Sequence, residues 1–148
     1  MYLNRDNICY FYGAKGQVMT DAAMDALIKA EPEYFAQYSE DEIKKIRKYS
    51  KGKIGYDCSG FVGACVGVME WSGALWSHCV NKTTVKQCKA GSILYRKGHV
   101  GIDLGYGMAM DVPKEMHSIE IFRNSPSDRK FTGAGEYYLY DYSEANNY

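Results

Sequence analysis

The sequence predicts an α+β fold in which helices pack on a central antiparallel sheet. Two patterns carry this prediction. Apolar residues recur at helical spacing over the first half of the chain, whereas after Ala90-Gly91 the apolar segments are short or alternating, with turn residues between them. The 148 residues, 46% of them hydrophobic, suffice for one hydrophobic core, so we expect one domain spanning residues 1–148.

The first predicted helix begins at Thr20 and Asp21, whose side-chain oxygens can accept hydrogen bonds from the first helical N–H groups. It ends at Glu31, because Pro32 pushes the preceding residue out of helical geometry. Its apolar face comprises Ala23, Met24, Leu27 and Ile28.

A second helix is predicted from Ser39, which forms a capping-box pattern with Glu42 and is followed by the inward-facing Ile43 and Ile46. Such a helix has a basic outer face that continues beyond its end. This face consists of Lys44, Lys45, Arg47, Lys48, Lys51 and Lys53. A run of this kind is typical of a solvated helix face, and a loose contact with an anionic polymer is the alternative.

A third helix is predicted from Cys58, because Val62, Cys65, Val66 and Met69 follow at helical spacing. Cys65 is expected to be a core residue. Three glycines interrupt this helix, and each costs about 1 kcal/mol relative to alanine. We therefore expect Gly60, Gly63 and Gly67 to allow close packing against the sheet.

The second half of the chain predicts five short strands, and the glycines around Tyr106 predict a tight hairpin between the second and the third. The last strand is expected at the edge of the sheet. The predicted strands are Ser92–Tyr95, His99–Leu104, Met108–Asp111, Ser118–Phe122 and Tyr137–Tyr142.

Composition argues against several classes of function. Eighteen basic and eighteen acidic residues cancel, so nucleic acid is not expected as a partner. The longest apolar stretch, Gly60–Trp76, is short for a bilayer and contains Glu70, so no membrane span is expected. Five cysteines are an odd number and no pair has Cys-x-x-Cys spacing, so neither a disulfide framework nor a metal site is expected.

Cys58 is the first candidate for chemistry. It lies where a loop meets a helix, so its sulfur faces unpaired N–H groups and the positive end of the helix dipole. That field favours the thiolate and is expected to lower the thiol pKa, as a nucleophile requires. Gly60 lets the backbone approach closely in the first turn. The alternative is a buried structural cysteine.

His99 is the second candidate. Strand alternation places it on one face with Gly101 and Asp103, where an imidazole can take a proton from the thiol and later give it to a leaving amine. Asp111 returns beside it after the hairpin and can hold the ring in one tautomer. The order cysteine, histidine, acid is that of papain-like peptidases.

The segments Asp57–Val62 and Gly98–Ile102, the second followed by a Leu-Gly-x-Gly hairpin, resemble the NlpC-type cell-wall cysteine peptidases. Upstream, Tyr10–Ala14 is similar to the aromatic, glycine-containing segment that precedes the nucleophile in that family. The resemblance covers roughly Tyr10 to Ile121 and implies a papain-like fold with the nucleophile at a helix N-terminus.

The resemblance also implies peptidoglycan stem peptides as substrate, cut commonly between D-glutamate, through its side-chain carboxyl, and a diamino acid. Cys58 would be the nucleophile, His99 the base and Asp111 the orienting residue, with no cofactor and no metal. The family's substrate-binding positions match Tyr10, Asp57 and Ser59, in many members through a free amino terminus.

The chain departs from the family pattern at two places that bear on the site. The third catalytic position is more often histidine, so His117 is the alternative to Asp111. The segment Gln17–Lys53 is longer and more helical than the loop that many members carry there, and it can reshape the substrate groove.

The sequence allows alternatives for the bond that is cut, the class of function and the location. The same residues would serve an N-acetylmuramoyl-L-alanine amidase, and a non-catalytic wall-binding or tail module is the alternative from another class. We expect a monomer that acts on the cell wall. No signal-peptide pattern begins the chain, which fits a phage lysis enzyme, an injected effector or a trimmed exported domain, and leaves the location unknown.

Overall fold

The computed structural model describes residues 1–125 and 127–145. The helices are η1 (Tyr2–Asn7, a 3-10 helix), α1 (Asp21–Ala30), α2 (Pro32–Phe35), α3 (Glu40–Ser50), α4 (Cys58–Val66) and α5 (Ser72–Ser77). The strands are β1 (Ile8–Tyr10), β2 (Lys15–Val18), β3 (Ile54–Tyr56), β4 (Cys79–Thr83), β5 (Ile93–Arg96), β6 (His99–Gly105), β7 (Met108–Asp111), β8 (Glu120–Arg123) and β9 (Gly133–Tyr137).

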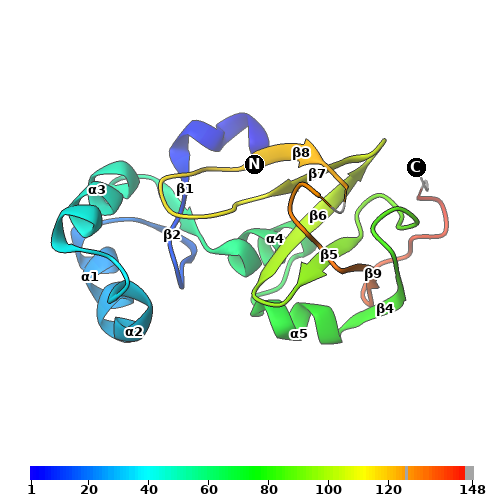
Figure 1. Ribbon diagram of the computed structural model, residues 1–148, viewed down its shortest axis with the longest axis horizontal. Helices are drawn as coiled ribbons and strands as arrows, with labels where there is room; N and C mark the ends of the chain where they lie inside the picture. The colour runs from blue at the N-terminus through cyan, green and yellow to red at the C-terminus, as the bar shows by residue number, and fades with distance from the viewer. Residues whose placement is uncertain (126, 146–148) are drawn as a thin grey trace.

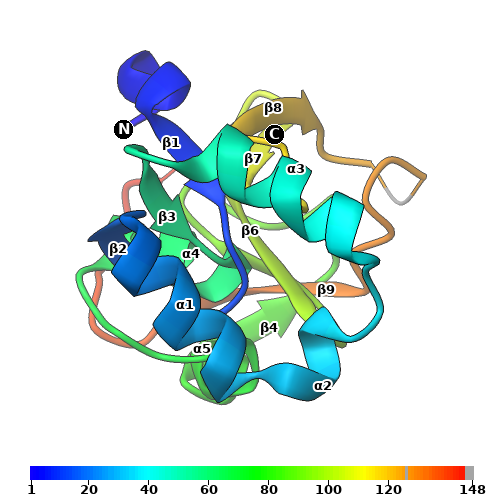
Figure 2. The same ribbon diagram turned by 90° about the vertical axis from the view of Figure 1, so that its left-hand side faces the viewer.

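The elements form two parts with α4 between them. Figure 1 shows α1, α2 and α3 gathered at one end and the large sheet at the other. Turning the molecule brings these three helices to the front, with the sheet behind them (Figure 2). Helix α4 contacts β6 of the large sheet on one side and β2 and β3 on the other. The first residues of α4 therefore lie where the two parts meet.

The large sheet confirms the predicted antiparallel arrangement. Its six strands follow the order β4-β9-β5-β6-β7-β8, and neighbouring strands are antiparallel throughout. The hairpin between β6 and β7 also lies where predicted. Tyr106 (φ 55°) and Gly107 (φ 73°) both adopt the left-handed conformation that tight hairpins need.

A second sheet was not predicted. Its three strands follow the order β1-β3-β2, and β1 pairs with β3 in parallel. These strands have only three or four residues each, too few for a clear alternation of apolar and polar side chains. Strand β4 is likewise absent from the prediction, because its three middle residues are exposed and two of them, Asn81 and Lys82, are polar.

The predicted last strand is wrong in its residues and in its place, because β9 is paired on both sides, with β4 and β5, and does not lie at the edge of the sheet. The strand runs over Gly133–Tyr137, and the exposed Tyr138 and Tyr140 follow it. Small residues lower the strand propensity of this segment but are needed there. A Cβ on Gly135 would lie 2.6 Å from the Cβ of Cys79, so only glycine fits against the neighbouring strand β4.

The two N-terminal helix starts are confirmed in detail. The Thr20 hydroxyl accepts a hydrogen bond from the N–H of Ala23 at 3.1 Å. Ser39 and Glu42 form the capping box reciprocally, the Ser39 hydroxyl accepting from Glu42 N–H and the Glu42 carboxylate from Ser39 N–H. These local signals were sufficient because capping depends on residues three positions apart.

Helix α4 is shorter than predicted, because Gly67 ends it in a left-handed conformation (φ 78°). Cys65 is exposed, so its prediction as a core residue is wrong. Close packing at two glycines is confirmed, but against loops. A Cβ on Gly60 would lie 2.6 Å from the carbonyl oxygen of Ala14, and one on Gly63 equally close to that of Val68.

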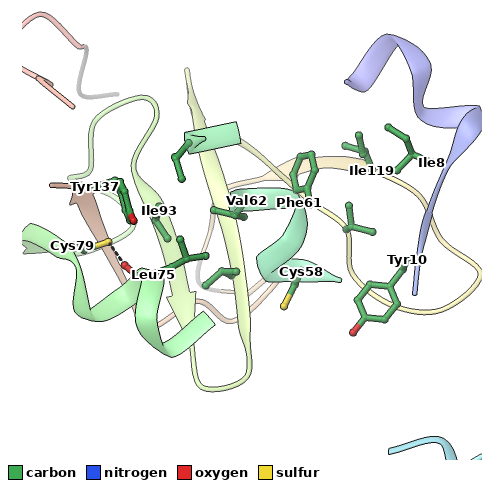
Figure 3. Close-up of a cluster of buried hydrophobic side chains, with 13 residues drawn as sticks. Ile8, Tyr10, Cys58, Phe61, Val62, Leu75, Cys79, Ile93, Ile119 and Tyr137 are labelled. Carbon is green, nitrogen blue, oxygen red and sulfur yellow. Dashed lines mark hydrogen bonds between the residues drawn. The ribbon is translucent and has the colours of Figure 1, made fainter. Parts of the chain in front are cut away.

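Two of the groups of buried side chains in the described interior adjoin Cys58 and the helical segment. One lies around α4 and the large sheet and includes Phe61, Val62 and Tyr137, with Cys58 and Tyr10 at one side (Figure 3). The other lies under the helical segment 17–53. Its buried members are Cys9, Phe11, Ala14, Met19, Met24, Phe35 and Ile46. Within the described residues, no helix has the length and apolar character to cross a membrane.

Candidate active site

Cys58 is the first residue of α4, and its side chain is 9% exposed. Asp57 caps the helix, since its carboxylate accepts a hydrogen bond from the N–H of Gly60 at 2.6 Å. The sulfur lies close enough to the N–H of Val100 to be hydrogen bonded by it. Val100 follows His99 in β6, so the thiol lies against the beginning of the strand that carries the imidazole.

The environment of Cys58 raises its thiol pKa, chiefly through burial and then through the negative charge of Asp57. The N–H groups of Val100 and Ser59 and the ammonium of Lys15 lower it without outweighing burial. The expected lowering by the helix N-terminus is thus wrong in direction. A thiol of raised pKa needs a nearby base to become a nucleophile at neutral pH.

His99 is 5% exposed and opens β6, opposite Arg96 of β5. Its Nε2 lies 2.7 Å from Oδ2 of Asp111, and its ring stacks on Phe131 with 5.5 Å between centroids and 11° between planes. A proton held on Nε2 by the carboxylate leaves Nδ1 as the nitrogen that can accept a proton. Gly101 on the same face leaves room for Phe131, because a Cβ there would lie 3.0 Å from its ring.

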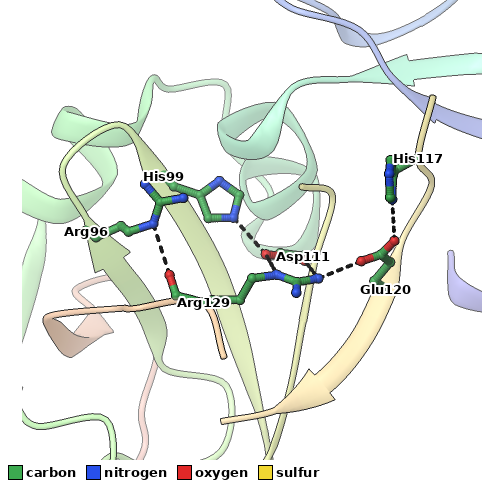
Figure 4. A network of polar contacts seen from close by, with 6 residues as sticks. All are labelled: Arg96, His99, Asp111, His117, Glu120 and Arg129. Carbon is green, nitrogen blue, oxygen red and sulfur yellow. Dashed lines mark hydrogen bonds and ion pairs between the residues drawn. The ribbon is translucent and has the colours of Figure 1, made fainter. Parts of the chain in front are cut away.

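Asp111 is fully buried at the end of β7 and belongs to a chain of charged side chains (Figure 4). Arg129 donates to it from Nε at 3.0 Å and from Nη2 at 3.3 Å. The same Nη2 donates to Glu120 at 2.6 Å. His117, the alternative third residue, lies 2.6 Å from the other oxygen of Glu120. The structure thus brings Asp111 to His99 and pairs His117 with Glu120.

Two of the three predicted substrate-binding residues are already paired with a cation. The ammonium of Lys15, the first residue of β2, lies 2.7 Å from Oδ1 of Asp57 and donates to the hydroxyl of Ser59 at 2.7 Å. Ser59 in turn donates to Asp57 at 3.1 Å. A substrate amine at this position would compete with Lys15.

Tyr10, the third predicted substrate-binding residue, is buried beside the thiol. Burial raises the pKa of its hydroxyl, and the negative charges of Cys58 and Glu115 raise it further, so the phenol stays neutral. Figure 3 shows its ring and the Cys58 sulfur on the same side of the buried group. Tyr34 hydrogen bonds to Glu115, and the Tyr38 hydroxyl donates to the same carboxylate at 2.8 Å.

An aromatic wall continues from Tyr10 onto the helical segment. Tyr12 stacks on Tyr34 with ring centroids 3.6 Å apart and planes 8° apart. Tyr34 and Tyr38 come from α2 and the loop after it, so the segment of uncertain role in the sequence supplies this wall. A hollow of about 520 Å³ adjoins it, lined by Tyr38, Glu42, Lys45, Ile46, Lys114, Glu115, Met116 and His117.

Lys15, Arg129 and Glu115 were missed at the sequence level. Each reaches its partner across a long stretch of chain, and none belongs to a local motif. The one available signal for Arg129 was indirect: a carboxylate that is buried, as that of Asp111 is, requires a cationic partner. In the described part of the chain, no cluster of three or more histidine, cysteine or acidic side chains could hold a metal ion.

The start of α4, with Cys58, thus lies against the start of β6, and the imidazole of His99 in β6 is bonded to Asp111 of β7. No protein-family model matches the chain, and no curated protein matches it. Among solved structures it is similar to the NlpC/p60 domain of the peptidoglycan hydrolase SagA. That similarity has 28% sequence identity and a TM-score of 0.46, and covers 55% of this chain and 77% of the other. The NlpC-type family is the one that the cysteine and histidine motifs resemble.

Proposed function

We propose that the chain is a peptidoglycan hydrolase, a cysteine endopeptidase that cuts amide bonds of stem peptides. One observation carries the proposal: Cys58 begins a helix that packs on β6, and β6 itself begins with His99, which is bonded to Asp111. The motifs around Cys58 and His99 suggest the substrate class. The bond between D-glutamate and the diamino acid is the proposed point of cleavage.

The reaction divides between the thiol and the imidazole. Nδ1 of His99 takes the proton from the Cys58 sulfur, and the thiolate attacks the amide carbonyl carbon. The oxyanion that forms is stabilised by backbone N–H groups at the start of α4, among them that of Cys58. The C–N bond then breaks, the amine leaves with the proton from His99, and the acyl group stays on sulfur as a thioester.

Hydrolysis completes the cycle. His99 takes a proton from water, and the resulting hydroxide attacks the thioester carbon. The C–S bond breaks, the sulfur regains a proton, and the product leaves as a carboxylic acid. Asp111 stabilises the imidazolium in both halves and holds the ring in one orientation.

Purified peptidoglycan tests the proposal. Digestion followed by mass spectrometry should give fragments cut within the stem peptide and a new amino group on the diamino acid. Release of whole stem peptides would instead indicate the second candidate, an N-acetylmuramoyl-L-alanine amidase with the same residues. Cys58→Ala should abolish either product, whereas Cys65→Ala, at an exposed cysteine on the same helix, should leave it unchanged.

A wall-binding or tail module without turnover is the alternative from another class. It predicts binding to peptidoglycan that Cys58→Ala and His99→Ala leave intact, with no soluble fragments from any variant. Turnover by the wild-type chain that disappears in both variants would exclude it. We further propose that the protein acts at the cell wall, as a monomer.

A further inference from the structure

Asp111 has two basic partners, His99 and Arg129, and only His99 is needed by the proposed reaction. The Asp111 side chain is completely buried, and Arg129 reaches both of its oxygens, at 3.0 Å and 3.3 Å. His99 shares Oδ2 at 2.7 Å. A buried carboxylate that serves one histidine would keep freedom to rotate, whereas two donors from a planar guanidinium fix the plane of the carboxylate.

Arg129 is itself held by contacts from two further strands, β5 and β8. Its backbone carbonyl accepts a hydrogen bond from Nε of Arg96 in β5 at 3.0 Å. Its guanidinium lies 4.4 Å from the centroid of the Phe122 ring in β8 and donates to Glu120 of the same strand at 2.6 Å. The side chain is 23% exposed, so solvent screens it only in part. These contacts, of which those with Arg96 and Glu120 are drawn in Figure 4, keep the guanidinium on Asp111.

We propose that Arg129 is a positioning residue that fixes the Asp111 carboxylate on His99 and limits how strongly that carboxylate raises the basicity of the imidazole. The proposal rests on the proposed function for its catalytic consequence but not for its effect on His99. A buried carboxylate without Arg129 would stabilise the imidazolium more strongly than one that the guanidinium also contacts. Arg129 offsets part of that charge, so the imidazole can both accept and return a proton.

Other charged and titratable groups near His99 also affect how readily its imidazole takes up a proton. Arg96 faces it across the β5–β6 pair, Cys58 lies against the next residue of β6, and Asp111, which Arg129 contacts, lies on the neighbouring strand β7. The ring of Phe131, which stacks on the imidazole, is uncharged. Removing Arg129 leaves the Asp111 carboxylate as the dominant neighbour, so the imidazolium pKa should rise.

Titration of His99 by nuclear magnetic resonance tests the proposal in the full chain. Arg129→Met should raise the imidazolium pKa of His99 by about one unit or more. Arg129→Lys keeps a charge without the planar fork and should hold that pKa near the wild-type value. Arg123→Met, at an exposed arginine of β8, is the matched control and should change nothing. His99→Gln assigns the resonance among the three histidines.

Hydrolysis of peptidoglycan provides the second readout. Arg129→Met should lower kcat about 10- to 100-fold with KM nearly unchanged, because misplacement of the base affects the chemical step. Its basic pH limit should move upward with the imidazolium pKa. A folded Arg129→Met with an unchanged His99 pKa would overturn the proposal.

Two further outcomes are distinguishable. Should Arg129→Met fail to fold, Arg129→Lys decides: a lower kcat at an unchanged pKa supports positioning, and an unchanged kcat overturns it. If the wild-type chain cleaves no peptidoglycan while Arg129→Met still raises the His99 pKa, the hydrolase proposal fails and the influence of Arg129 on His99 stands.

Discussion

Replacing Lys15 by methionine removes the ammonium that joins Asp57 and Ser59 at the start of α4. The Lys15 and Asp57 side chains are 25% and 13% exposed, so this pair is shielded far better than a surface ion pair. Asp57 keeps its hydrogen bonds from the N–H of Gly60 and the hydroxyl of Ser59, so its charge is not left without partners. We therefore expect a loss of about 2–3 kcal/mol in the free energy of unfolding.

For a chain of this length, such a loss corresponds to a fall of roughly 4–12 °C in Tm, which calorimetry measures directly. Lys51→Met is the matched control, because Lys51 pairs with Asp21 at 3.0 Å with both side chains more than 60% exposed. That variant should show no measurable change in Tm. If Lys15→Met melts like the control, the pair does not stabilise the start of α4 and the reasoning from burial is refuted.

Further predictions concern the thiol, the imidazole and the aromatic wall. Because burial raises the pKa of Cys58, His99→Ala should slow alkylation of the Cys58 thiol at pH 7 at least tenfold and move the pH at which the alkylation rate rises to above 9. Iodoacetamide labelling with peptide mapping measures this rate, and an unchanged pH profile would show that His99 is not the base. Gly101→Ala should destabilise the fold by about 1–3 kcal/mol and displace the ring that stacks on His99, seen as lower Tm and kcat; wild-type values for both would contradict the close contact. Burial raises the pKa of Tyr38, and the Glu115 carboxylate that its hydroxyl contacts raises it further, so Glu115→Gln should lower that pKa in a spectroscopic phenol titration; no shift would mean that the contact is absent.

Local signals made parts of the fold predictable. The caps at Thr20 and Ser39 and the hairpin at Tyr106 depend on residues within a few positions of one another, and all lie where expected. The cysteine and histidine motifs are also local, and each lies at the start of its predicted element. Physical chemistry of short segments was sufficient for these features.

Contacts between distant segments were not predictable in the same way. The strand at Gly133–Tyr137 forms there because its glycines fit closely against β4, and a glycine-rich sequence does not by itself predict a strand. Lys15 and Arg129 become part of the site only when the second sheet and the loop before β9 are in place. The predicted direction of the Cys58 pKa shift was wrong for a related reason, because the degree of burial is a property of the whole fold.

Strand β1 belongs to both groups of buried side chains, with consequences for how the specificity of such a chain can change. Ile8 and Tyr10 face the group that contains Cys58, whereas Cys9 and Phe11 face the group under α1–α3. This short extended segment thus separates the buried group around Cys58 from the one under the helices α1–α3. Changes in the helices α1–α3 would therefore alter the surface beside Tyr10, while the contacts of Cys58 with β6 and of His99 with Asp111 stay in place.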